Sequence, residues 1–313
     1  MKLAVIFNGQ GAHYEGMGMD FVAQYETAKS VFDAFEQQTT FPIRQWITSD
    51  IQQLSQTRYA QVAIAATSLA IYYSIQAELP AIDYMAGLSL GEYSALVAGG
   101  YISLDSAISL LQKRGELMSV HCETLAQKAP AQMVAVMGSS QSALQALIDD
   151  AHLSESVFLA NINSSQQIIV AGTGAGIEQF TQLAKAQGIK KILPLKVEGP
   201  FHSPLMAPVC EPFGEVLAEV DVQKGQIPVI SNTTLDMHTA DTLKETLVQH
   251  LVAPVQWQQT IDFFVKEGVT HLIQIGPGQT LAQLLKRESQ APQCFVVDKV
   301  EDVAALHTWI KGE

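Results

Sequence analysis

The stretch that most constrains the fold is residues 87–91, Gly-Leu-Ser-Leu-Gly, because it separates two different kinds of segment. The residues before it, 82–86, are short, mostly apolar and free of Gly and Pro, which is typical of a buried strand. The residues after it, 92–98, are rich in helix formers and stop at Gly99-Gly100. A strand, a tight turn and a helix form the context of a nucleophile elbow. We therefore expect Ser89 to project from a sharp turn at the start of a helix.

The same pattern also fits an ordinary glycine turn with a solvated serine. Glycine alone makes up about 7% of an average protein, so Gly-x-Ser-x-Gly also arises by chance. Other parts of the chain must decide between a catalytic and an incidental serine.

Composition limits the classes of function. The 313 residues are 48% hydrophobic and 16% charged, which is typical of one large globular domain or of a domain with a smaller insert. A net charge of −13 argues against nucleic acid and against anionic membranes as partners. Cys122, Cys210 and Cys294 are far apart and lack metal-ligand spacing, which favours a reducing, cytoplasmic setting. No stretch is long enough to span a membrane, and the first apolar run is too short for a secretion signal.

Three more segments carry candidate functional residues. Residues 3–7 predict a buried strand, which breaks at 8–12, Asn-Gly-Gln-Gly-Ala, a loop that either presents backbone N–H groups or is a plain turn. Arg114 falls among the apolar positions of a helix expected over 104–122, so it either extends to solvent or binds an anion. His202 lies on a loop made rigid by two prolines; catalytic residues concentrate on such loops, but a lone histidine there is more often incidental.

The order of expected elements predicts an α/β fold. Residues 133–195 alternate as strand, helix, strand, strand, helix and strand, the βαββαβ order of ferredoxin-like folds, and suit a self-contained insert. On both sides of it, helices separate apolar strands, including expected strands at 227–231, 272–275 and 295–297. This alternation predicts a mainly parallel sheet that is covered on both faces.

Five motifs resemble, in order, those of the malonyl-CoA:acyl carrier protein transacylases, the acyltransferases of fatty-acid synthesis. They are Gly-Gln-Gly-Ala at 9–12, Gly-Leu-Ser-Leu-Gly-Glu-Tyr at 87–93, Lys-Arg-Gly-x-x-Met at 113–118, Phe-His-Ser-Pro-Leu-Met at 201–206 and Gly-Pro-Gly at 276–278. The match spans nearly the whole chain. It implies an α/β-hydrolase-like core with a mainly parallel sheet, formed by 1–127 and 197–313. It also implies a ferredoxin-like subdomain inserted at 128–196, with the active site between the two parts.

The resemblance assigns roles to single residues. Ser89 corresponds to the nucleophile and His202 to its base. Arg114 corresponds to the group that holds the free carboxylate of the substrate, for which the paired donors of guanidinium are suited. The backbone N–H groups of Gln10 and Leu90 correspond to the oxyanion hole.

The same resemblance places Gly9, Gly11 and Phe201 among the substrate-binding residues, and a Phe-His pair goes with selection of malonyl groups. In the family a backbone carbonyl, not an acid, orients the catalytic histidine. That carbonyl corresponds to His250, which stands where a glutamine is frequent. Asn8 stands where Pro is common.

The implied reaction is a two-step transfer. Malonyl-CoA acylates the serine, CoA leaves, and the phosphopantetheine thiol of holo acyl carrier protein takes the malonyl group, with ping-pong kinetics and no metal or tightly held cofactor. The alternatives are an acyl hydrolase, a transferase acting for a polyketide pathway, and a non-catalytic subunit that docks the carrier protein. An arginine in the acyl pocket disfavours hydrolysis of simple acyl groups.

Overall fold

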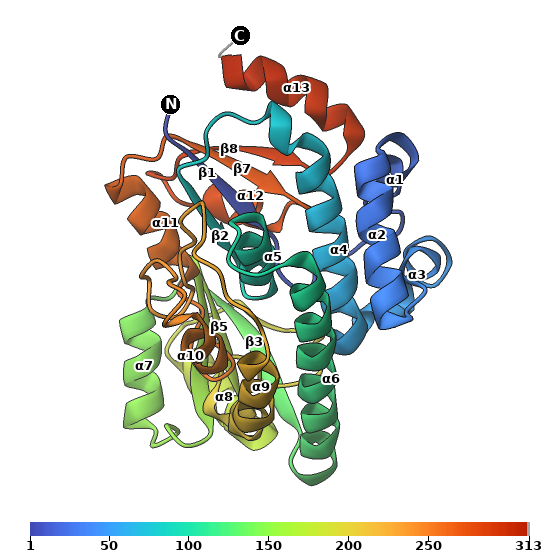
Figure 1. Ribbon diagram of the computed structural model, residues 1–313. Coiled ribbons are helices and arrows are strands. Elements are labelled where there is room, and N and C mark those ends of the chain that lie inside the picture. Colours follow the sequence, from blue (N-terminus) through green and yellow to red (C-terminus); the bar gives the residue numbers. More distant parts are fainter. Residues whose placement is uncertain (312–313) are drawn as a thin grey trace.

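The computed structural model describes residues 1–311, which form two sheets of different kinds (Figure 1). Sheet A is parallel and has the strand order β2-β1-β7-β8. Its strands are β1 (Leu3–Phe7), β2 (Tyr84–Gly87), β7 (His271–Ile275) and β8 (Gln293–Val297).

The three strands that precede the sequence motifs end level with one another. Phe7 at the end of β1 pairs with Gly87 of β2 and with Ile275 of β7. Because parallel strands have their carboxyl ends at the same edge of a sheet, the loops that follow leave from one place. Sheet A thereby brings together the 8–12 loop, the Ser89 turn and the Gly-Pro-Gly segment.

Helices cover both faces of sheet A, as predicted. Leu3, Val5 and Phe7 join a large apolar cluster, whereas Ala4 and Ile6 join a smaller one on the opposite face. The helices that contribute to the large cluster are α1 (Met19–Gln24), α2 (Glu26–Thr39), α3 (Ile43–Ser49), α4 (Thr57–Ile75), α5 (Leu90–Ala98), α6 (Leu104–Lys128), α9 (Cys210–Ala218), α10 (Leu243–Gln249) and α13 (Val300–Lys311). Those of the smaller cluster are α11 (Trp257–Lys266) and α12 (Thr280–Leu285). Short 3-10 helices lie at η1 (Ile51–Ser55), η2 (Gln76–Glu78) and η3 (Pro204–Val209).

Sheet B is antiparallel and has the order β4-β5-β3-β6. Its elements follow the predicted βαββαβ order: β3 (Ala131–Met137), α7 (Gln141–Asp150), β4 (Val157–Ser164), β5 (Gln167–Thr173), α8 (Gly174–Ala186) and β6 (Ile192–Pro194). One face packs on α7 and α8 in its own apolar cluster, and the other joins the large cluster. These elements fall within 128–196; the division into two domains at those bounds stays a prediction.

The structure differs from the prediction at three segments. Residues 227–231 make isolated bridges, Met85 with Val229 and Ile230 with Met237, and no strand, because Pro228 has no N–H to continue a ladder. The apolar spacing of residues 21–37 predicts one helix, but the structure has two, α1 and α2, which separate where Tyr25 is extended. Helix α6 runs on to Lys128. No helix within residues 1–311 has both the length and the apolar character needed to cross a membrane.

Candidate active site

Ser89 lies at the junction of β2 and α5, as the sequence predicted. Its φ is 53° and its ψ −106°, which places a non-glycine residue in a sparsely populated conformation. A Cβ atom on Gly87 would lie 1.9 Å from the carbonyl carbon of Gly91, and one on Gly91 would lie 2.2 Å from the carbonyl oxygen of Phe7. The two glycines therefore allow β1, β2 and α5 to meet closely enough to form the turn.

His202 is brought to Ser89 from 113 residues further along the chain. Ser89 Oγ and His202 Nε2 are 2.7 Å apart. His202 also has a positive φ, 57°, and it is 5% exposed. Ser203 Oγ donates to the carbonyl of Pro200 at 2.5 Å and closes the loop around the histidine. Such a buried, constrained loop holds the imidazole against the serine.

The carbonyl of His250 fixes the tautomer of His202. Its oxygen lies 2.8 Å from His202 Nδ1. Since a carbonyl only accepts hydrogen bonds, Nδ1 carries the proton and Nε2 is free to accept from the Ser89 hydroxyl. Burial and, to a smaller extent, the Arg114 cation lower the pKa of His202, the His250 carbonyl opposes them, and the net result is a pKa of about 4. The imidazole is therefore neutral at pH 7, the state that a general base requires.

Arg114 is 1% exposed, which rules out the alternative that its side chain extends to solvent. Its Nη1 donates to Gln61 Oε1 at 2.7 Å, and its guanidinium carbon lies 5.1 Å from the centre of the Tyr93 ring. Nε and Nη2 have no hydrogen-bond partner within the described chain. These two donors form one edge of the guanidinium, and the two oxygens of a carboxylate can accept hydrogen bonds from both of them side-on.

The predicted oxyanion-hole residues lie on the loops that flank Ser89. Gly9 packs against the elbow so closely that a Cβ there would lie 2.3 Å from the Leu88 carbonyl oxygen. The Gln10 side chain donates to Thr57 Oγ1 at 3.0 Å and so fixes the loop, while Gly11 has a φ of 93°. Leu90 is the first residue of α5, and the first N–H groups of a helix have no partner within it.

Phe201, beside His202, is 7% exposed and belongs to the large apolar cluster. The structure thus brings His202 and the His250 carbonyl to Ser89, with Phe201 next to His202 in the chain. The predicted roles of these residues in a reaction remain predictions.

Sequence reasoning missed three buried polar residues. Gln61 binds Arg114, Asn232 accepts the N–H of Ser89 at 2.7 Å, and Glu92 is fully buried on α5. Gln61 and Glu92 are polar residues in otherwise apolar helices, and this feature of the sequence could have marked them as candidates. Asn232 lies in irregular chain and gave no such signal.

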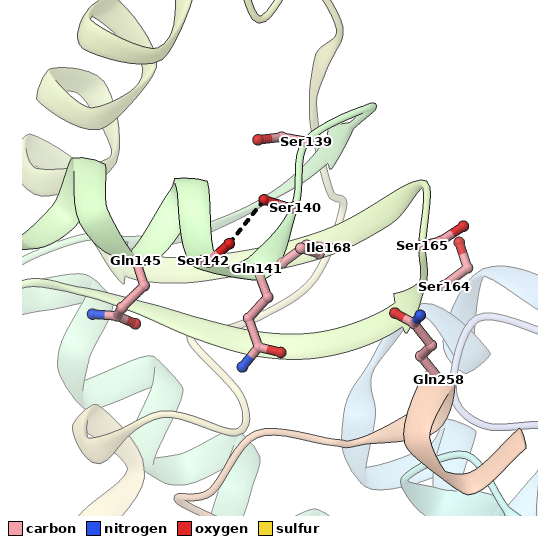
Figure 2. Close-up of a pocket in the computed structure, with 9 residues that line it drawn as sticks. All are labelled: Ser139, Ser140, Gln141, Ser142, Gln145, Ser164, Ser165, Ile168 and Gln258. Atoms are coloured by element: carbon pink, nitrogen blue, oxygen red, sulfur yellow. Dashed lines mark hydrogen bonds between the residues drawn. The ribbon is translucent and has the colours of Figure 1, made fainter. Parts of the chain in front are cut away.

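A separate cavity of about 600 Å³ lies at the start of α7 (Figure 2). Serine and glutamine side chains of the 139–168 segment line it, together with Ile168 and with Gln258 of α11. None of its nine lining residues is charged or is a predicted site residue. The cavity is distinct from the Ser89–His202 pair.

A parallel α/β core with a serine on a sharp turn and a neutral histidine beside it defines an enzyme of acyl-group chemistry. The protein-family model described as "Acyl transferase domain" matches residues 5–313. The chain belongs to this acyltransferase family, and within it to the malonyl-CoA:acyl carrier protein transacylases. The family resemblance and the predicted fold class are thereby confirmed.

Relatives and solved structures match over the full length. The malonyl CoA-acyl carrier protein transacylase of Bacillus subtilis is 36% identical, covering 100% of this chain and 98% of the relative. That of Haemophilus influenzae is 32% identical, covering 99% of each. The crystal structure of MCAT from Streptococcus pneumoniae has a TM-score of 0.92 and 34% identity, covering 98% of this chain and 100% of the other. A malonyl-transacylase in complex with a type II PKS acyl-carrier protein has a TM-score of 0.93 and 29% identity, covering 100% of each chain.

Proposed function

We propose that this enzyme transfers a malonyl group from malonyl-CoA to the thiol of holo acyl carrier protein, through a malonyl ester on Ser89. The shared name of the relatives supports the reaction. The observation in this chain that carries the substrate assignment is Arg114. It is a buried cation with a free Nε–Nη2 edge, close enough to His202 to lower its pKa. A buried, half-satisfied guanidinium is costly unless a substrate carboxylate completes it.

The first half-reaction forms the ester. Ser89 Oγ bonds to the thioester carbon while its proton moves to His202 Nε2. The carbonyl oxygen becomes an oxyanion, which the N–H groups of Gln10 and Leu90 stabilise. The carbon–sulfur bond then breaks, and the proton passes from His202 to the sulfur of the departing CoA. Arg114 holds the carboxylate of the malonyl group throughout.

The second half-reaction runs the same steps with a new thiol. His202 takes the proton of the phosphopantetheine thiol, whose sulfur bonds to the malonyl carbonyl carbon. The ester carbon–oxygen bond breaks, and the proton returns to Ser89 Oγ. The thiol enters, in this proposal, between the core and the 128–196 insert, and no metal or cofactor takes part.

The proposal assigns the acceptor to fatty-acid synthesis and the enzyme to the cytoplasm. The first rests on the resemblance to the fatty-acid family and the second on the three free cysteines. A relative in complex with a polyketide carrier protein makes the polyketide acceptor the alternative. Comparing kcat/KM for the two kinds of holo carrier protein decides between them.

The deciding experiment is incubation with malonyl-CoA labelled in the malonyl group, without any acceptor. Stable label on the protein, absent in Ser89→Ala, is the expected result. Label released as malonate would indicate a hydrolase instead, and neither label nor release would indicate a non-catalytic docking subunit. Intact-protein mass spectrometry reports the adduct, and chromatography of the labelled small molecules reports released malonate.

A further inference from the structure

The side chain of Asn232 holds the backbone of Ser89. The Ser89 N–H donates to Asn232 Oδ1 at 2.7 Å, across 143 residues of sequence. Ser89 has a φ of 53°, which is unfavourable for a residue with a side chain. A hydrogen bond to its backbone helps to keep the turn in this conformation. Asn232 is itself fully buried, so its position depends on its own partners.

Glu92 supplies one of those partners. Its Oε2 accepts the backbone N–H of Asn232 at 3.0 Å. Glu92 is fully buried and lies in the first turn of α5, three residues after Ser89. The chain from Ser89 through α5 to Glu92, then to Asn232 and back to Ser89, is therefore a closed ring. The backbone N–H of Gln256 donates to the Asn232 carbonyl at 2.9 Å and anchors the ring from outside.

The Glu92 carboxylate also lies near His250, the residue whose carbonyl orients His202. Glu92 Oε1 lies 2.6 Å from His238 Nε2, and Oε2 lies 3.9 Å from His250 Nε2. His250 is the residue whose carbonyl accepts the His202 Nδ1–H, and the two imidazole rings are 5.0 Å apart, centre to centre. A buried carboxylate is costly without donors around it, and here both oxygens face donors.

We propose that Glu92 and Asn232 are positioning residues of this enzyme: Glu92 holds Asn232, and Asn232 holds the main-chain N–H of Ser89, so that Ser89 Oγ stays aligned with His202 Nε2. The inference rests on the proposed function only in that Ser89 is the nucleophile. It has a consequence for the oxyanion hole. Because the Ser89 N–H already donates to Asn232, the Leu90 N–H is the donor of the elbow that remains for the oxyanion.

The test measures two rates in each variant: acylation by malonyl-CoA in a single turnover, and labelling of Ser89 by a fluorophosphonate. The second reaction needs the serine and histidine but no malonyl group. Asn232→Ala and Glu92→Ala are expected to slow both rates about 10- to 100-fold, the cost of a small misplacement of reacting atoms. The Kd for malonyl-CoA and the preference for malonyl over acetyl groups stay unchanged, since Arg114 is not altered.

Conservative and combined variants separate positioning from general damage. Glu92→Gln keeps an oxygen for the Asn232 N–H and recovers most of the loss, as does Asn232→Asp, which keeps an acceptor for the Ser89 N–H. Because the two residues act in series, the double alanine variant is no slower than the slower single one. Thr67→Val, which removes a buried hydroxyl bonded within α4, is the control for an unrelated buried polar change.

Three outcomes overturn the proposal. They are an unchanged fluorophosphonate rate in Asn232→Ala, losses that multiply in the double variant, and a parallel loss of malonyl-CoA affinity. If Glu92→Ala does not fold, the contrast between Asn232→Ala and Asn232→Asp decides alone. A wild-type enzyme that reacts with the fluorophosphonate but forms no malonyl adduct would reject the proposed function and leave the positioning test intact.

Discussion

Two neighbours of His202 act on it in opposite directions. Burial and the Arg114 cation disfavour the imidazolium, and the His250 carbonyl, which accepts from Nδ1, favours it. The balance lowers the pKa to about 4, well below the usual 6.5 or so of histidine. In the proposed reaction, His202 is thus ready to accept a proton at neutral pH and readily passes that proton to the leaving sulfur.

This balance predicts the pH dependence of Ser89 reactivity. His202 accepts the serine proton only when Nε2 is unprotonated, which is the case above its pKa. The rate of fluorophosphonate labelling is therefore expected to be flat between about pH 5 and pH 8 and to fall as the pH approaches 4. Arg114→Gln removes a cause of the lowered pKa, so the acid limb moves to higher pH. An acid limb at the same pH in both proteins, with folding checked by circular dichroism, contradicts this account.

Arg114 also gives the sharpest test of the substrate. A buried, side-on pair between guanidinium and carboxylate contributes roughly 2–4 kcal/mol, or about 30- to 1000-fold in kcat/KM. Arg114→Ala is expected to lower kcat/KM for malonyl transfer by that factor. The kcat/KM for acetyl transfer is expected to stay the same or to rise, because no unpaired cation is left in the pocket. The measurement is kcat/KM for malonyl-CoA and acetyl-CoA in both proteins.

Acetyl-CoA serves as the internal control for that variant, because it lacks only the carboxylate. Equal losses for the two substrates would make Arg114 a structural residue and remove the main support for the assignment. Methylmalonyl-CoA is expected to be a poor substrate of both proteins, because we expect the buried ring of Phe201, next to His202, to leave little room for a branch.

At the scale of elements, the site depends on how closely α5 approaches sheet A. The start of α5 sits against the end of β1, with the Gly91 Cα facing the Phe7 carbonyl. Any side chain at this position must displace main chain, because the obstructing atom is backbone. The elbow is therefore a property of three elements together and not of the Gly-x-Ser-x-Gly pattern alone.

Two glycine substitutions on helices test this point. In Gly91→Ala the new methyl group would lie 2.2 Å from the Phe7 oxygen, so we expect a loss of about 3 kcal/mol or more in the free energy of unfolding. In Gly214→Ala, on α9, the new methyl would lie 3.7 Å from a Val248 methyl group, an ordinary van der Waals contact, so we expect the higher helix propensity of Ala to raise the free energy of unfolding by about 0.5–1 kcal/mol. Urea unfolding measures both. Similar effects at the two positions would show that the close approach at Gly91 is not limiting.

The sequence predicted those elements whose signal is local. Apolar runs next to glycine turns located β1, β2 and the elbow, and the alternation of strands and helices predicted the insert. The contacts of Gln61 and Asn232 were not predictable, since each depends on a partner more than 50 residues away that only the fold brings close. The strand expected at 227–231 was wrong because the apolar pattern ignored the missing N–H of Pro228.

At the scale of the whole molecule, charge sets how a carrier protein approaches. The chain has a net charge of −13, and acyl carrier proteins are acidic, so the net electrostatic interaction between the two partners is repulsive. Exposed lysines gather between α8 and β6 at Lys190 and Lys191, with Lys185 and Lys196 nearby in sequence. This segment leads into β6, the edge strand of sheet B, whose elements lie in the lower half of Figure 1, whereas α2 packs on α4 in the upper half.

We predict that this lysine segment attracts the acceptor. Lys190→Glu/Lys191→Glu is expected to raise the KM for holo carrier protein, most strongly at low ionic strength, because screening shortens the range of the interaction. Loading of Ser89 by malonyl-CoA in the absence of carrier protein stays unchanged, since neither lysine touches the serine–histidine pair. Lys29→Glu/Lys266→Glu, on α2 and α11, changes the net charge equally and is the matched control. If both double variants raise the KM by the same factor, only the net charge matters and the segment is not a docking surface.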